Sequence, residues 1–172
     1  MVFHIVKNLD DYYKNIMDKK WFNKLIICYF TASWCGPCRM ISPDITTLGE
    51  KAESILVLKI DVDECEDVSA QCEIDCMPTF RFHIGNNLEP TKKLMGADKT
   101  QLFNIVGDIL NQIKESNQKY NLQNHSQNHN HQQNHNQQQN SNSNSNQTQN
   151  VRRNNEMDVP FLYNPIPEHK FK

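Results

Sequence analysis

The sequence predicts a small α/β domain whose mostly parallel sheet finishes in an antiparallel hairpin. Two apolar runs, LIICYFTA (25–32) and SILVLKIDVD (54–63), show no alternation of polar and apolar residues, which is typical of central strands covered on both faces. Helical spacing follows each of these runs. The run TFRFHIG (79–85) alternates instead and leads into turn residues, which indicates a hairpin. The resulting order, βαβαβαββα, is that of an α/β domain.

The elements of the first half follow from local periodicity. Residues 3–7 form a short apolar segment consistent with an edge strand, and apolar residues recur at helical spacing across residues 8–21. After the central strand at 25–32, the spacing is helical from Trp34 to about Lys51. The second half holds a short helical candidate at residues 64–74.

The hairpin and a last helix complete the domain. Strand 79–85 places its apolar side chains on one face and Arg81 and His83 on the other, as a half-buried strand does. Residues 88–96 should return antiparallel beside it. A helix from about 98 to 116 closes the fold. Its apolar stripe consists of Leu102, Val106, Ile109, Leu110 and Ile113.

The globular part is expected to end near Ser116. Residues 121–151 contain no Asp, Glu, Lys or Arg and consist mainly of Asn, Gln, Ser and His, so they cannot bury enough apolar surface to offset the entropy of ordering. We therefore predict a domain at 1–116 and a disordered low-complexity segment at 117–150. The tail at 151–172 regains aromatic and proline residues. This segment is either a short linear docking motif or a segment without a role.

Composition excludes two classes of partner and indicates a compartment. The net charge of -2 gives no basic field for nucleic acid. The longest apolar run is far shorter than the about 20 residues that a bilayer span needs, and the first residues do not resemble a secretory signal. We expect a soluble cytoplasmic protein, in which paired thiols usually serve metal binding or redox chemistry.

The motif WCGPC, residues 34–38, favours redox chemistry. Cys35 lies where a helix begins, so unsatisfied N–H groups and the helix dipole lower its thiol pKa, and the thiolate is the nucleophile. Cys38 lies on the same helical face and can close a small disulfide ring. Gly36 lets a partner approach closely, and Pro37 stiffens the first turn.

A zinc site is the alternative explanation of the cysteines. Structural zinc takes four ligands, usually as two close pairs, and Cys65, Cys72 and Cys76 do not form a second C-x-x-C. Nothing orients the histidines of the low-complexity segment toward a metal. We therefore predict no metal and no cofactor. Those histidines are His125, His129, His131 and His135.

Two segments carry a family resemblance. WCGPCRMISP (34–43) resembles the active-site signature of thioredoxins, and DVDECEDVSAQCEIDCMPTF (61–80) is similar to animal-type cytosolic thioredoxins, within a likeness spanning residues 2–113. The resemblance implies a thioredoxin fold, a mixed five-stranded sheet flanked by four helices. It also implies a monomeric disulfide oxidoreductase in cell redox homeostasis, which an NADPH-dependent thioredoxin reductase regenerates and which acts on protein disulfides.

The resemblance also implies residue roles. Cys35 would be the nucleophile, Cys38 the resolving thiol of the redox-active disulfide, and Gly36 and Pro37 would tune the redox potential. Met77-Pro78 would be a cis-proline turn beside the pair. Packing at Trp34 and a simple turn at Gly96 remain alternatives to docking. The docking surface would comprise Trp34, Met77, Pro78, Gly96 and Ala97.

Tyr29 departs from the family, which places a buried aspartate six residues before the first cysteine. A tyrosine is a poor base at neutral pH, so we expect exchange to survive with a slower resolving step. A redox sensor or binding module with little turnover is the alternative function. Lys59 matches the family's lysine beside that aspartate, and its ammonium would favour a Cys38 thiolate unless it is simply an exposed strand residue.

The remaining cysteines receive separate interpretations. Cys28 lies inside an apolar strand and is expected to be an inert core residue. Cys65 and Cys72 on one helix would be separated by about 10 Å of rise, too far for a disulfide. Cys76 should be exposed beside the active site, which makes it the candidate regulatory thiol and the candidate link of a dimer formed on oxidation.

Overall fold

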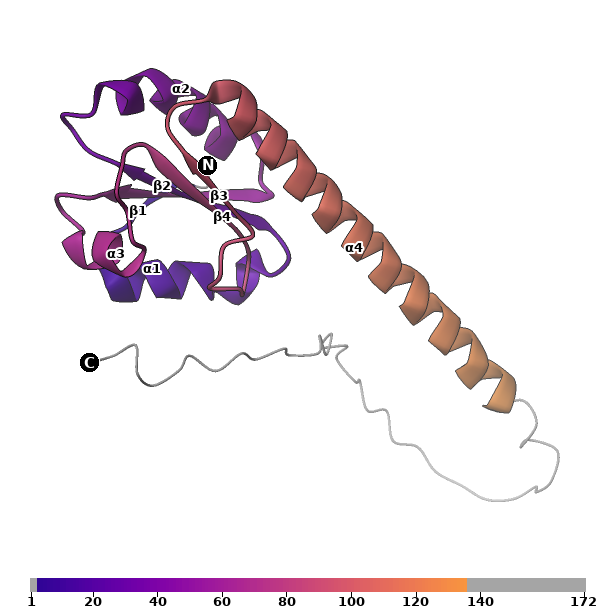
Figure 1. Cartoon of the computed structure of the whole chain (residues 1–172). Helices are drawn as coiled ribbons and strands as arrows, with labels where there is room; N and C mark the ends of the chain where they lie inside the picture. The colour runs from indigo at the N-terminus through magenta and orange to yellow at the C-terminus, as the bar shows by residue number, and fades with distance from the viewer. Residues whose placement is uncertain (1–2, 136–172) are drawn as a thin grey trace. The chain divides into compact units, whose positions relative to one another are not determined.

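A computed structural model describes residues 3–135 of the chain, except for the side chains of residue 51 and residues 121–135. The described residues contain one five-stranded sheet, drawn in Figure 1. Its strands are β1 (Phe3–Ile5), β2 (Leu25–Thr31), β3 (Ile55–Asp61), β4 (Thr79–Ile84) and β5 (Lys92–Met95).

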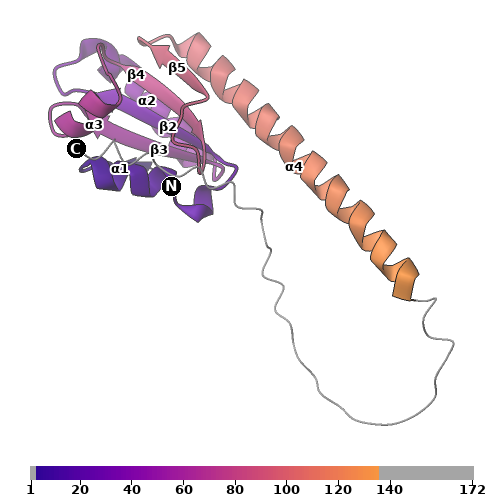
Figure 2. The ribbon, with the colours of Figure 1, turned by 60° about the horizontal axis from the view of Figure 1, so that its bottom comes forward.

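The strand order is β1-β3-β2-β4-β5. Strands β1, β3 and β2 run parallel, β4 is antiparallel to β2, and β5 is antiparallel to β4. Figure 2 shows β5 as the edge strand beside β4. All seven residues of β2 are buried, which explains why its sequence shows no alternation. The predicted mixed sheet is therefore confirmed.

Helices cover both faces of this sheet. One core contains the odd-numbered residues of β2 together with residues of α2 and α4, and the other contains the even-numbered residues together with α1 and α3. Figure 1 shows α1 and α3 on the side of the sheet opposite α2. The helices are α1 (Leu9–Ile16), a 3-10 turn η1 (Lys19–Trp21), α2 (Gly36–Lys51), α3 (Glu66–Gln71) and α4 (Lys99–His135).

The prediction that β4 has a solvated face is wrong at His83, whose exposed fraction is 0%. Strand β4 lies between β2 and β5, and α1 and α3 cover the face that was expected to meet water. Nδ1 of His83 lies 3.1 Å from the backbone oxygen of Asn87, and Nε2 has no partner among the described residues. Burial lowers the pKa of His83 to about 4.

The last helix is longer than predicted. Helix α4 continues past the expected end at Ser116 to His135, into the segment at 117–150 for which disorder was predicted. The sequence contains neither Gly nor Pro between residues 108 and 159, and these are the residues that most strongly stop a helix. Among the α4 side chains that the structure describes, which extend to Tyr120, the last buried one is Ile113, close to the predicted limit of the packed domain.

The chain divides into two units, Met1–His131 and Gln132–Lys172, and the sheet and both cores belong to the first. Residues 136–150 of the predicted low-complexity segment and the tail at 151–172 lie outside the described residues. No helix within residues 3–135 has both the length and the apolar character required to cross a membrane.

Candidate active site

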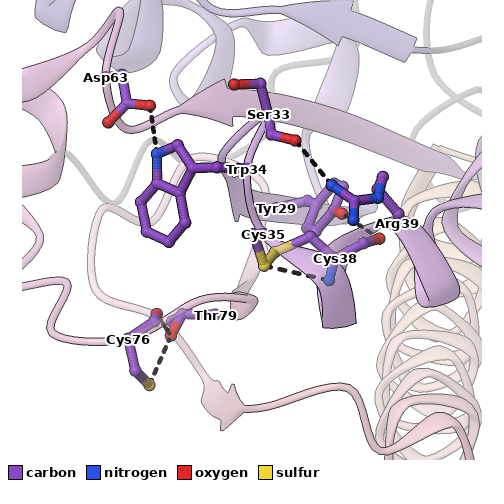
Figure 3. Close-up of a disulfide and its surroundings, with 9 residues drawn as sticks. All are labelled: Tyr29, Ser33, Trp34, Cys35, Cys38, Arg39, Asp63, Cys76 and Thr79. Atoms are coloured by element: carbon purple, nitrogen blue, oxygen red, sulfur yellow. Dashed lines mark hydrogen bonds between the residues drawn. A yellow bond between two sulfur atoms is a disulfide. The ribbon is translucent and has the colours of Figure 1, made fainter.

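A disulfide joins Cys35 and Cys38 at the beginning of α2, with Cα atoms 5.3 Å apart (Figure 3). Cys35 is the N-cap residue of the helix, and its Sγ accepts a hydrogen bond from the Cys38 N–H at 3.2 Å. A sulfur at this position faces the positive end of the helix dipole. The first turn of α2 contains no acidic residue, so no carboxylate there opposes a negative charge on Cys35.

The loop before α2 brings the disulfide to the carboxyl end of the central strand. Strand β2 ends at Thr31, and the Ala32 carbonyl then accepts the Cys35 N–H at 3.2 Å. Arg39 Nη1 donates to the Ser33 carbonyl at 3.1 Å, which fixes the same loop from the helix side. Reactive groups of open α/β sheets gather at this kind of strand end.

Trp34 lies on the surface next to the disulfide, with 63% of its area exposed. Its Nε1 donates to Asp63 Oδ2 at 2.8 Å, so the polar edge of the indole is satisfied within the chain. Cys35, by contrast, is only 4% exposed. A partner must therefore present its own sulfur closely to Cys35, beside an apolar indole face.

The Met77-Pro78 peptide bond is cis, as the resemblance implies. The Pro78 carbonyl accepts the Gly96 N–H at 2.7 Å, and Gly96 has a φ of +87°, a left-handed conformation that favours glycine. Met77 and Ala97 pack against the same core cluster as Cys35. The Pro78–Gly96 hydrogen bond thus joins the two loops that carry the predicted docking residues after Trp34.

Tyr29 is buried, with 2% of its area exposed, and its hydroxyl donates to the Cys38 carbonyl at 3.0 Å. The ring stacks on Phe80 with centroids 5.2 Å apart and planes 11° apart. Burial raises the pKa of Tyr29. The hydroxyl is therefore neutral at physiological pH, and Tyr29 is not a proton acceptor for Cys38.

Lys59 lies directly across the β2–β3 ladder from Tyr29, and its parity along β3 places it on the same face of the sheet. It is half-buried, so the alternative of an exposed strand lysine is wrong. Strand β3 lies between β1 and β2, an interior position in which a strand residue is less exposed than at the edge of a sheet.

The free cysteines lie in different environments. Cys28, Cys65 and Cys72 are buried in the core beneath α1 and α3, whereas Cys76 is exposed. Burial raises the pKa of Cys28 and Cys65, which keeps these thiols protonated. Cys76 Sγ lies 3.7 Å from the Thr79 hydroxyl, in the loop that leads to Pro78 (Figure 3). No cluster of potential metal ligands occurs among the described residues.

Two contacts of this site were not anticipated from the sequence. The Trp34–Asp63 bond was accessible to inference, because Asp63 follows β3 and the carboxyl ends of parallel strands meet at one edge. The Tyr29–Cys38 bond gave no such signal, because the expected partner at that position was a side-chain thiol and the observed partner is a backbone carbonyl.

Comparison with known proteins gives one consistent result. The thioredoxin family model matches residues 4–108. Similar curated proteins include thioredoxin of Ovis aries, 40% identical over 87 residues (51% of this chain, 81% of the relative), and thioredoxin of Callithrix jacchus, 39% identical over 108 residues (62% and 100%). Among solved structures, a poplar thioredoxin h has a TM-score of 0.58 at 34% identity, covering 64% of this chain and 97% of that one.

These matches confirm the thioredoxin fold and the thiol–disulfide oxidoreductase activity that the WCGPC motif predicted. Proteins of this family act on disulfide-containing protein substrates, which agrees with an apolar indole surface beside a nearly buried disulfide. The chain belongs to the thioredoxin family.

Proposed function

We propose that this chain is a monomeric, cytoplasmic protein-disulfide reductant that an NADPH-dependent thioredoxin reductase keeps reduced. Cys35 is its nucleophile and Cys38 its resolving thiol. The observation that carries this assignment is the asymmetry of the pair: Cys35 Sγ caps α2 and accepts the Cys38 N–H at 3.2 Å. That environment favours a thiolate at Cys35.

The exchange takes two steps. In the reduced chain, the Cys35 thiolate attacks one sulfur of a partner disulfide, which forms a mixed disulfide and releases the partner's other sulfur as a thiolate. Cys38 then loses its proton and attacks Cys35 Sγ, which forms the Cys35–Cys38 disulfide and releases the second partner thiolate. Two electrons have passed to the partner, and the released thiolates take up protons.

The docking surface supports protein substrates. Trp34 offers an exposed apolar ring, and the Met77-Pro78 turn lies against Gly96, whose backbone N–H is bound to Pro78. An extended partner segment that pairs beside this turn would be a short case of strand addition. Gly36 and Pro37, in the first turn between the two cysteines, tune the redox potential in this proposal.

A redox sensor with little turnover is the second candidate function. The observation that favours it is Tyr29, whose neutral hydroxyl replaces the carboxylate that would accept the Cys38 proton. Lys59 on the same face of the sheet then serves as an auxiliary group that favours the Cys38 thiolate. The intact cysteine pair favours the reductase over the sensor, because a binding module has no chemical need for both sulfurs.

The test is NADPH-driven reduction of a model protein disulfide by the full chain in the presence of a thioredoxin reductase. We expect turnover in the wild type and none in Cys35→Ser or Cys38→Ser. Cys76→Ser is the matched control, because Cys76 is the exposed thiol of the same region, and it should retain turnover. A mixed disulfide that accumulates in the wild type without turnover would instead establish the sensor.

Dimer formation on oxidation and cytoplasmic localisation need separate measurements. Cys76 is the thiol we assign to an oxidation-dependent dimer, because it is the exposed free cysteine of the described region. Such a dimer should appear on a non-reducing gel after oxidation and be absent in Cys76→Ser. Cytoplasmic localisation should appear as recovery in the soluble fraction of lysed cells, and recovery in a vesicle or organelle fraction would contradict it.

A further inference from the structure

We propose that Tyr29 is a positioning residue of the disulfide centre, which holds the Cys38 backbone so that the Cys38 N–H stays on the Cys35 sulfur. This inference rests on the proposed reductase function and assigns to Tyr29 a purpose other than proton transfer. It would make the tyrosine a stabiliser of the Cys35 thiolate in the reduced chain.

Tyr29 itself is held firmly in the core. Its ring is buried and stacked on Phe80, which is also fully buried. Its backbone lies within β2, paired with β3 on one side and β4 on the other. The hydroxyl that donates to the Cys38 carbonyl, at a donor–acceptor distance of 3.0 Å, is therefore held in place by the sheet and by the stacked ring.

Two hydrogen bonds hold the backbone of Cys38 from opposite sides. The carbonyl of Cys38 accepts the Tyr29 hydroxyl, and the N–H of Cys38 donates to Cys35 Sγ at 3.2 Å. These two peptide groups flank the same Cα atom, so the bond that fixes one limits the rotation of the other. Figure 3 shows Tyr29 and the two cysteines in this arrangement.

Helix α2 lacks one backbone hydrogen bond close to this turn. Pro43 lies inside α2 and has no N–H, so the Arg39 carbonyl lacks the ladder bond that residue 43 would provide. The Cys38 carbonyl is the acceptor immediately before this gap. A hydrogen bond from the sheet at Cys38 therefore supports the turn where the helix supports itself least.

The chemical consequence concerns the reduced chain. A hydrogen bond to an ionised sulfur is stronger than one to a neutral sulfur, so an N–H held on Cys35 stabilises the thiolate more than the disulfide. Loss of the Tyr29 hydroxyl should raise the pKa of the Cys35 thiol and make the chain harder to reduce. The charged groups on the elements around the site remain in place in Tyr29→Phe. They are Arg39 on α2, Lys59 and Asp61 on β3, and Asp63 after β3.

The experiment compares Tyr29→Phe with the matched control Tyr12→Phe in the full chain. Tyr12 is equally buried but lies beneath α1 and α3, where its hydroxyl contacts the Cys72 thiol at 3.5 Å. The first readout is the pH titration of thiolate ultraviolet absorbance in the reduced chain. The second is the equilibrium constant for reduction by glutathione.

For Tyr29→Phe we expect both the acid dissociation constant of Cys35 and the equilibrium constant for reduction to fall about fivefold, the usual effect of one hydrogen bond. Tyr12→Phe should change neither. Equal values for Tyr29→Phe and the wild type, or equal shifts in both variants, would overturn the inference. Hydrogen exchange at the Cys38 amide adds an independent check, with faster exchange expected in Tyr29→Phe alone.

The outcome is separable from the test of the proposed function. Wild-type turnover with unchanged constants in Tyr29→Phe would leave the reductase assignment in place and remove the role of Tyr29. Absence of wild-type turnover would remove the reductase assignment, while the titration of Cys35 would still report whether the tyrosine stabilises its thiolate.

Discussion

Cys35 and Cys65 both occupy the N-cap position of a helix, yet their surroundings favour opposite protonation states. The sulfur of Cys35 accepts the backbone N–H of Cys38. The thiol of Cys65 instead donates to the Val6 carbonyl at 3.2 Å. An acceptor sulfur suits the thiolate, whereas a donor thiol must keep its proton.

The charges of the first helical turn reinforce this difference. Helix α2 begins with no acidic residue, whereas α3 begins with Glu66 and Asp67. Burial raises the pKa of Cys65, and the nearby carboxylates raise it further. A helix N-terminus is therefore not sufficient to activate a cysteine. Whether the thiol is activated depends on the direction of the sulfur's hydrogen bond and on the charge of the first helical turn.

The largest expected effect tests this contrast directly. Cys35→Ser should abolish turnover with a protein disulfide, because a hydroxyl does not take part in disulfide exchange. Cys65→Ser should retain turnover, since Cys65 lies in the other core. Initial rates of NADPH oxidation, with thioredoxin reductase present, measure both. Loss of turnover in a folded Cys65→Ser chain would break the comparison.

The second expected effect concerns Phe80, the buried ring on which Tyr29 stacks. Phe80→Ala should lower the free energy of unfolding by about 3 to 5 kcal/mol, the cost of removing a buried aromatic ring from a packed core. Phe80 is fully buried against Tyr29. Urea unfolding measures the change. Phe103→Ala is the control, because Phe103 is exposed and should cost within about 0.5 kcal/mol.

The third expected effect concerns the opposite core, at His83. The unfolded chain protonates this histidine below about pH 6.5, whereas the folded chain does so only near pH 4. Since the unfolded state binds more protons in this window, the stability is fully present above pH 6.5 and is lost as pH falls toward 4. We expect a loss of up to about 3 kcal/mol.

Urea unfolding across this pH range, in the wild type and in His83→Leu, measures the effect. The variant should lose most of the slope between pH 6.5 and 4. An unchanged slope in His83→Leu would show that other groups cause the acid sensitivity.

The fourth expected effect returns to Tyr29 and the resolving step. Tyr29→Asp places a carboxylate beneath Cys38, and we expect the lifetime of the mixed disulfide to shorten at least about tenfold, because a positioned base can accept the Cys38 proton. Acid-quenched trapping of the mixed disulfide measures its lifetime. Tyr29→Asn is the matched control, of similar size to aspartate but without a base. An unchanged lifetime in Tyr29→Asp would show that proton removal does not limit resolution.

Features of this structure that depend on neighbouring residues in the sequence can be predicted from it, whereas features that depend on contacts between distant segments cannot. Strand β2 and the cysteine pair at its carboxyl end follow from local apolar runs and from the residues WCGPC. The burial of His83 does not, because an alternating strand has the same sequence whether water or helices cover its second face. The end of α4 at His135 does not either, since no Gly or Pro marks a stop.

The smallest expected effect concerns an ion pair between α2 and α4, the two helices that pack on the same face of the sheet. Lys99 Nζ lies 2.7 Å from Asp44 Oδ1 and links the start of α4 to α2. The lysine is largely exposed, so Lys99→Met should cost less than about 1 kcal/mol of unfolding free energy, and less at high salt. Urea unfolding at low and high salt measures it, with Lys92→Met as the control on an exposed residue of β5. A larger, salt-independent loss would show that Lys99 contributes through the packing of its stem on Phe103.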